Sequence, residues 1–337
     1  MKREEVLSLL KAVSPALVGK GLLPVLSHFC LDGKTIMAYD GVVALQTRCD
    51  WPLHGGLPGE VLLSVLAASR AKEVKIEVLD STVLLIAGRT KLKLALLPAE
   101  DFIFSPPKYR GKKVLLTDSF REAVALASRS SAENIHTSSL SGVTLHFQKS
   151  EVVLYSTDAA TSVKVRAPCE SADLKGTVLI LPKRFHSLLQ EIGAKELLLT
   201  QEGDIICKSN LVRLYGKVVQ GADSSMYENM LTAVVPENLQ FAKIPTGLSR
   251  CLERALLLNK ETTRFSYADG RLEVFTEGGG SELRDSIKLS LDIPPIVVYT
   301  CAEYLLRYLD AVDFIGISDR CFVLKGDNCQ VVVAVKS

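Results

Sequence analysis

The chain has 337 residues, a formal net charge of +2 and a hydrophobic fraction of 47%. This length is too great for one ordinary core and predicts two or three domains, while the apolar fraction argues against disorder. The near-neutral charge excludes a global basic field that would attract nucleic acid, so any charge-based function must come from local patches.

Cysteine usage and the N-terminal segment indicate the compartment. Eight cysteines are scattered without a CxxC pair or another short metal-ligand spacing. Most lie in apolar runs, where a cysteine is usually a small core residue. We therefore expect a cytoplasmic, reducing environment, with no metal and no cofactor. The first residues, MKREEVLSLLK, predict an amphipathic helix rather than a signal peptide, and no apolar run is long enough to span a membrane.

In chain order, the first hundred residues or so predict one helix followed by strands. The helix covers residues 1–12, and strand-like runs follow in which the Asp32-Gly33 pair is a hairpin signal. After a loop rich in glycine and proline, Glu60 to Leu63 is predicted as a short strand and Ser64 to Lys72 as a short helix. Two further strands lead to the most informative segment of the chain.

That segment, RTKLKLALLPAEDF, begins at Arg89 and alternates strictly in its first part. Lys91 and Lys93 share one face with Arg89, whereas Leu92 and Leu94 share the other. This period of two predicts a β-strand with a basic face and a leucine face. The strand is either an ordinary half-buried one or an edge that pairs with another chain, and the pattern alone leaves both open.

The same order of elements returns twice more. The second copy starts with a helix that we expect Ser119 to cap, with Glu122 completing a capping box, and the third copy starts at Gly247. Each copy continues into a strand–helix–strands half, which gives a period of roughly one hundred residues. Like edges on successive copies suggest a curved or closed assembly. The predicted domains are residues 1–112, 113–237 and 238–337.

Three segments within this repeat carry a family resemblance. LPVLSHFCL (23–31), LLPAEDF (96–102) and STDA (156–159) resemble the bacterial β sliding clamp, the processivity factor of the replicative DNA polymerase. The resemblance covers essentially the whole chain in order. It implies an α+β chain with three tandem copies of the DNA-clamp fold. Two such chains would form a closed ring around duplex DNA, with helices inside and sheets outside, and no reaction would be catalysed.

The resemblance also implies a dimer interface between the first predicted domain of one chain and the third of the other. Its basic strand face would meet acidic side chains of the partner. Exposed ion pairs contribute little each, so we expect leucine burial to supply affinity and charge to set the register. The alternative is that the leucines near residue 257 belong to the core of their own domain. The implied residues are Arg89, Lys91, Leu92, Leu94, Leu257, Leu258, Glu282 and Asp285.

Double-stranded DNA is the second implied partner, bound without sequence preference. Contacts from basic and polar side chains to phosphate are blind to sequence and sensitive to salt, as a mobile clamp requires. The alternative is that such side chains are only solvated. The residues carried over by resemblance are Lys20, Asn134, His136, Lys183, Arg184 and Arg254.

The third implied site is a pocket for a short hydrophobic peptide of the DNA polymerase and of clamp-loader subunits. This chain has Ala-Ala-Thr-Ser at 159–162 where the family usually has Gly-His-Arg-Leu, and VAVKS where the family usually has Met-Pro, a basic residue and Leu. We therefore expect a smaller, less polar pocket that accepts a different peptide. The implied residues are Leu140, Thr157, Ala159, Ala160, Thr161, Ser162, Met230, Val331, Val333, Ala334 and Val335.

Two other classes of function compete with this interpretation. An enzyme is disfavoured because the five histidines are spread over separate elements, with no local Ser-His-Asp or Cys-His pattern. The glycines at 278–280 lie between strands and lack a following helix that would bind phosphate. The second alternative is a clamp-fold protein that serves only as a protein-binding platform and does not encircle DNA.

Overall fold

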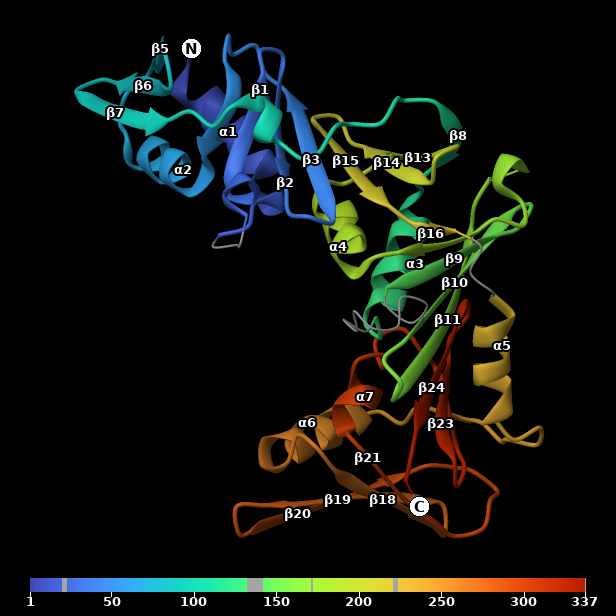
Figure 1. The fold of residues 1–337 in the computed structure, drawn as a ribbon. Coiled ribbons are helices and arrows are strands. Elements are labelled where there is room, and N and C mark those ends of the chain that lie inside the picture. Colours follow the sequence, from blue (N-terminus) through green and yellow to red (C-terminus); the bar gives the residue numbers. More distant parts are fainter. Residues whose placement is uncertain (20–22, 132–141, 171, 221–223, 337) are drawn as a thin grey trace. The chain divides into compact units, whose positions relative to one another are not determined.

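The computed structural model describes residues 1–19, 23–131, 142–170, 172–220 and 224–336 (Figure 1). The chain forms two compact units, Met1–Leu116 with Arg184–Val218 and Thr117–Lys183 with Val219–Ser337. The α-helices are α1 (Arg3–Val13), α2 (Gly59–Ala68), α3 (Asp118–Ser128), α4 (Lys183–Glu191), α5 (Ser224–Ala233), α6 (Leu248–Leu258) and α7 (Ala302–Leu306). Short 3-10 turns are η1 (Ser14–Ala16), η2 (Pro24–Ser27), η3 (Ala99–Asp101) and η4 (Ala172–Leu174).

The first unit contains two sheets. An eight-stranded sheet has the order β4-β1-β2-β3-β15-β14-β13-β8, and a three-stranded sheet has the order β5-β6-β7. Helix α1 packs on β2 and β3 through Val6, Leu10 and Val13, which are buried. The strands are β1 (His28–Asp32), β2 (Thr35–Tyr39), β3 (Val43–Arg48), β4 (His54–Pro58), β5 (Lys75–Leu79), β6 (Thr82–Ala87), β7 (Thr90–Ala95), β8 (Gly111–Leu115), β13 (Glu196–Thr200), β14 (Asp204–Lys208) and β15 (Val212–Lys217).

The second unit also contains two sheets, with the orders β16-β12-β9-β10-β11-β24-β23-β22-β17 and β20-β19-β18-β21. Helix α3 packs on β10 and β11, and α6 packs on β19, β20 and α7. The strands are β9 (Val143–Phe147), β10 (Glu151–Thr157), β11 (Thr161–Pro168), β12 (Val178–Leu181), β16 (Val219–Gln220), β17 (Ala242–Lys243), β18 (Thr263–Ala268), β19 (Arg271–Gly278), β20 (Ser281–Lys288), β21 (Ile296–Thr300), β22 (Phe314–Ile317), β23 (Cys321–Lys325) and β24 (Cys329–Ala334).

Two strand motifs alternate along the chain. A four-strand motif, in which the fourth strand returns beside the first, occurs as β4-β1-β2-β3, as β12-β9-β10-β11 and as β21-β18-β19-β20. A three-strand meander occurs as β5-β6-β7, β13-β14-β15 and β22-β23-β24. The repeat of half-units expected from the sequence is therefore present as a repeat of strand order.

Most predicted elements are confirmed, including the strand that carries the basic and leucine faces, which is β7. The predicted strand at Glu60 to Leu63 is wrong, because α2 already begins at Gly59 and the preceding strand is β4. Within β4, a Cβ atom on Gly55 would lie 2.6 Å from the Leu97 carbonyl oxygen, so this close approach requires glycine. The cap of α3 is Thr117, whose hydroxyl accepts the Phe120 N–H, rather than Ser119.

Candidate protein-interaction site

Within each unit, the third strand in chain order of a four-strand motif pairs with the third strand of a three-strand meander. We call the antiparallel pair β3–β15 the first junction and the pair β11–β24 the second junction. At the centre of the first, Leu45 lies opposite Leu214, and at the centre of the second, Val163 lies opposite Val331. All four side chains are buried. An apolar cross-strand pair therefore stabilises both junctions.

At the first junction, an aspartate fixes the turn that leads into β3. Asp40 Oδ1 accepts the backbone N–H groups of Val42 and Val43, each at 2.9 Å. Asp40 Oδ2 accepts Arg184 Nε at 2.8 Å, and the same guanidinium donates to the Pro15 carbonyl oxygen. We call an aspartate that caps this turn and also binds an arginine an aspartate clip. It ties the four-strand motif to α4.

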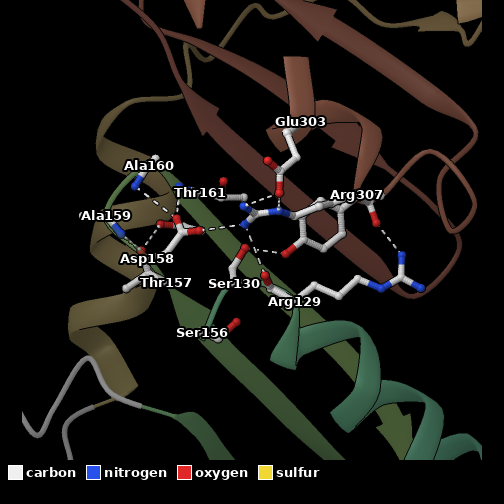
Figure 2. A network of polar contacts seen from close by, with 12 residues as sticks. Arg129, Ser130, Ser156, Thr157, Asp158, Ala159, Ala160, Thr161, Glu303 and Arg307 are labelled. Carbon is white, nitrogen blue, oxygen red and sulfur yellow. Dashed lines mark hydrogen bonds and ion pairs between the residues drawn. The ribbon is translucent and has the colours of Figure 1, made fainter. Parts of the chain in front are cut away.

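The second junction carries the same arrangement (Figure 2). Asp158 Oδ1 accepts the N–H groups of Ala160 at 3.2 Å and Thr161 at 2.7 Å, and Oδ2 accepts Arg307 Nη1 at 2.9 Å. Arg307 also donates to Glu303 through Nε and Nη2. This aspartate clip therefore ties the turn between β10 and β11 to the end of α7.

A second arginine extends this network. Arg129, at the end of α3, donates to both carboxylate oxygens of Asp310, at 2.5 and 2.9 Å, and to the Arg307 carbonyl oxygen. Its hydrogen bonds hold the pKa of Asp310 below the usual carboxyl value. Burial raises the pKa of Tyr308 to about 12, so its phenol stays protonated and hydrogen-bonds to the Ser130 hydroxyl. The network therefore pairs the charges of Arg129 with Asp310 and of Arg307 with Asp158.

Strand β20 is equivalent to the junction strands β3 and β11, and β7 is equivalent to β15 and β24. Unlike them, β7 and β20 each lie at a sheet edge with no further partner strand among the described residues. Leu92 and Leu283, at their centres, are only half-buried. The turn before β20 starts with Gly278 instead of an aspartate, and a Cβ atom there would lie 2.3 Å from the Leu258 carbonyl oxygen. In the described part of the chain, these two edge strands therefore have neither the second strand partner nor the aspartate clip of the junctions.

The residues expected at a dimer interface cluster on these edges. Arg89, Lys91 and Glu282 are exposed, and Leu257 at the end of α6 is 84% exposed, whereas Leu258 is half-buried. Two of the expected residues have internal roles. Leu94 is buried in its own unit, and Asp285 accepts Arg254 Nε at 2.8 Å.

The residues expected to bind DNA are described in part. Lys20, Asn134 and His136 lie outside the described residues. Lys183 is the first residue of α4. Arg184 is bound by Asp40 in the first aspartate clip, and Arg254 is bound by Asp285. Both arginines therefore already have a carboxylate partner, which sequence reasoning did not anticipate.

The residues expected in a peptide pocket lie largely around the second junction. Thr157, Thr161, Val331 and Val333 are buried, and Leu140 lies outside the described residues. Ala160 and Ala334 are joined by a backbone hydrogen bond of 2.8 Å. The remaining members have some exposure: they are Ala159, Ala160, Ser162, Met230, Ala334 and Val335. Most of these side chains are small, and Ala159 and Ala160 directly follow Asp158, which binds Arg307.

Sequence reasoning missed both aspartate clips. One signal was available, since Asp40 and Asp158 each directly follow an equivalent strand and precede a small residue, in YDG and TDA. Their arginine partners lie 144 and 149 residues away. No group of three or more His, Cys, Asp or Glu side chains in the described ranges could hold a metal ion, and no helix there is long and apolar enough to cross a membrane.

Comparison with known proteins identifies the fold. No family model and no curated sequence matches the chain. Among solved structures, the DNA polymerase III subunit beta from Pseudomonas aeruginosa matches with a TM-score of 0.87 at 18% identity, over 100% of this chain and 99% of the other. The DNA polymerase sliding clamp from Bacillus subtilis matches with 0.86 at 13% identity, over 100% and 98%. The Helicobacter pylori beta clamp bound to a DNA ligase peptide matches with 0.81 at 13% identity, over 100% and 99%. The chain therefore has the α+β fold of bacterial sliding clamps.

Proposed function

We propose that this chain is a sliding clamp, two copies of which close head to tail into a ring around duplex DNA and tether a polymerase for processive synthesis. On this proposal the chain is a binding protein rather than an enzyme, with one clamp domain in each of residues 1–112, 113–237 and 238–337. The observation that carries the proposal is the pair of free edges, β7 and β20, because the equivalent strands are paired at both junctions.

The two junctions share one register, which predicts how the free edges would pair. The first residues after the equivalent turns are Val43, Thr161 and Ser281 on one side, and Val212, Cys329 and Thr90 on the other. At the first junction Val43 lies opposite Gly216, which is four residues after Val212. At the second, Thr161 lies opposite Val333, which is four residues after Cys329. By the same offset, β7 of one chain would meet β20 of the other in the pairs Thr90–Asp285, Leu92–Leu283, Lys93–Glu282 and Leu94–Ser281.

This register is chemically consistent. Leu92 and Leu283 occupy the positions of the buried pairs Leu45–Leu214 and Val163–Val331, so pairing would bury a third apolar cross-strand pair. On the opposite face, Lys93 would meet Glu282. Asp285 would lie opposite Thr90 and keep its bond to Arg254. Only the pair Lys91 and Arg284 would bring like charges together. Both side chains are exposed, so their charged ends can point away from each other into solvent.

The DNA and peptide sites remain proposals that rest on this assembly. Phosphate contacts from Lys20, Asn134, His136, Lys183, Arg184 and Arg254 would be independent of sequence. Arg184 and Arg254 would have to exchange or share their carboxylate partners to make them. Polymerase and clamp-loader peptides would dock near the exposed small residues of the second junction. One similar structure, the Helicobacter pylori clamp, is described with a bound ligase peptide.

The test is a covalent ring closed on DNA. Cysteines at Leu92→Cys and Leu283→Cys should form a disulfide between chains, because directly opposite residues have Cα atoms about 4.5–5.5 Å apart, within the range of a disulfide. The reduced variant is mixed with nicked circular DNA and oxidised, and the complex is passed through a sizing column at high salt. A closed ring should stay on the circle and leave once the DNA is linearised.

The matched control is Leu92→Cys with Ser281→Cys, a diagonal pair about 7–8 Å apart that should cross-link poorly. Equal cross-linking of both variants would reject the register. A covalent dimer that does not stay on circular DNA at high salt would reject encirclement and favour the protein-binding platform. Retention on linear DNA would also reject encirclement, because a topological link is lost when the circle is cut, and repeating the column at several salt concentrations would measure any electrostatic share of the binding.

A further inference from the structure

A hollow of about 430 Å³ lies in the first unit, where the ends of β3 and β14 meet the turn before β15. Four cationic side chains line it, those of Lys34, Arg48, Lys208 and Arg213, against the single carboxylate of Asp50. In a chain whose formal net charge is only +2, this is a concentrated positive site. Its lining is otherwise polar, apart from a valine and a leucine of the turn.

The four cations of this hollow differ in their contacts. The side chains of Lys34, Arg48 and Lys208 are exposed and form no ion pair within the part of the chain that the structure describes. The Arg213 guanidinium lies over the Tyr109 ring, 5.6 Å from its centroid. Like charges gathered around a concave surface raise the local potential and attract anions. The hollow is therefore predominantly positive, with Glu196 opposite Lys208 on the neighbouring strand.

The second unit provides an internal comparison. A smaller hollow of about 210 Å³ lies at the equivalent place of the second junction, and Arg166 and Lys325 there correspond to Arg48 and Lys208. Its two lysines are engaged within the unit, since Lys164 Nζ lies 2.6 Å from Glu228 and Lys325 Nζ lies 3.9 Å from the centroid of the Phe241 ring. The junction geometry produces a hollow in both units, but only the first has unengaged lysines.

We propose that the hollow of the first unit binds an acidic segment of a partner polypeptide. A flexible acidic chain can place carboxylates inside a concave site of this size, whereas the phosphates of duplex DNA lie on a convex surface that a hollow does not follow. Leu211, 51% exposed at the rim, offers an apolar contact next to the charges. This assignment is independent of the proposed clamp function, because it uses neither the free edges nor the ring.

The experiment measures binding of a fluorescein-labelled peptide of consecutive glutamates flanked by leucines, by fluorescence anisotropy. Arg48→Glu with Lys208→Glu should weaken binding by about tenfold or more, and Arg48→Lys with Lys208→Arg should keep it. Arg166→Glu with Lys325→Glu is the matched control and should change binding less than about twofold. Higher salt should weaken the wild-type complex, as expected for partly exposed charges.

Circular dichroism and the fluorescence of Trp51, which is in the first unit, verify that each variant is folded. The proposal is overturned if wild type shows no saturable binding, or if both charge-reversal variants lose binding equally. It is also overturned if an oligonucleotide or inorganic phosphate displaces the peptide at lower concentration than unlabelled acidic peptide does, since that would assign a phosphate site. Failure of the ring test would leave this result unaffected.

Discussion

Removing an aspartate clip should destabilise one unit by a measurable amount. Asp158, whose side chain is 22% exposed, accepts two turn N–H groups and one guanidinium N–H. Asp158→Ala leaves all three donors without this acceptor. Hydrogen bonds to charged groups contribute about 1.5–3 kcal/mol. Because Glu303 still binds Arg307 and the turn is near solvent, we expect a total cost of about 2–3 kcal/mol.

Asp158→Asn separates the turn cap from the ion pair. The amide oxygen can still accept from the turn, so mainly the charge is lost, and a partly exposed ion pair is worth up to about 1 kcal/mol. Asp40→Ala and Asp40→Asn are the matched variants in the first unit, where the Asp40 side chain is more deeply buried. We expect the same ranking there, with Ala costing more than Asn.

The assay uses the single tryptophan of the chain. Trp51 is 1% exposed and belongs to the first unit, so its fluorescence reports the unfolding of that unit in urea, while far-UV circular dichroism reports both units. Asp40→Ala should shift the fluorescence transition, and Asp158→Ala should shift only part of the dichroism transition. The reasoning is refuted if Asp→Ala costs less than about 0.5 kcal/mol at both sites, or if Asn costs as much as Ala.

Three further predictions follow from single contacts. Arg129 holds the folded-state pKa of Asp310 below its ordinary 3.8, so the pair stabilises the fold above pH 3.8 and loses its contribution as pH falls through the lowered pKa. Asp310→Asn should therefore be less stable than wild type at neutral pH. In unfolding titrations at decreasing pH, the difference in free energy of unfolding between variant and wild type should shrink. Ala159 has a φ of +71°, so Ala159→Gly should raise the free energy of unfolding by about 1 kcal/mol, and a decrease in urea midpoint would contradict this. Leu92→Glu should convert a dimer to folded monomers in light scattering, whereas Leu94→Glu should also unfold the first unit because Leu94 is buried.

The sequence predicted features that depend on neighbouring residues. The alternation after Arg89 gave the strand β7, and the apolar spacing after Gly247 gave the helix α6. Both patterns repeat within a single element, so local physics determines them. The error at Glu60 to Leu63 has a local cause as well, since a run of apolar residues after glycine and proline suits a short strand as well as a buried helix.

Pairings across long sequence distances could not be predicted in the same way. Nothing local in YDG or TDA indicates that Arg184 or Arg307 will supply the guanidinium. Arg254 was assigned to a phosphate contact by its resemblance to the basic residues of the clamp family. The neighbouring strand β20 supplies Asp285 as its partner, and a strand partner is fixed only by tertiary structure. Basic residue type thus indicated a charged surface, and the fold determined which charges are already paired.

The contrast between the junctions and the free edges bears on how tightly a ring would close. An unpaired edge strand invites association, and natural proteins usually protect it. The proposed contact joins two edges of different kind, β7 and β20, so repeated pairing is heterologous and would give either a closed ring or an open filament. The two junctions within the chain combine an apolar strand pair with an aspartate clip. The junction between chains would have an apolar pair but no aspartate clip, because Gly278 leaves no room for a side chain. Dissociation of the ring should therefore precede unfolding of either unit, since the contact that joins the chains lacks a stabilising element that both internal junctions have.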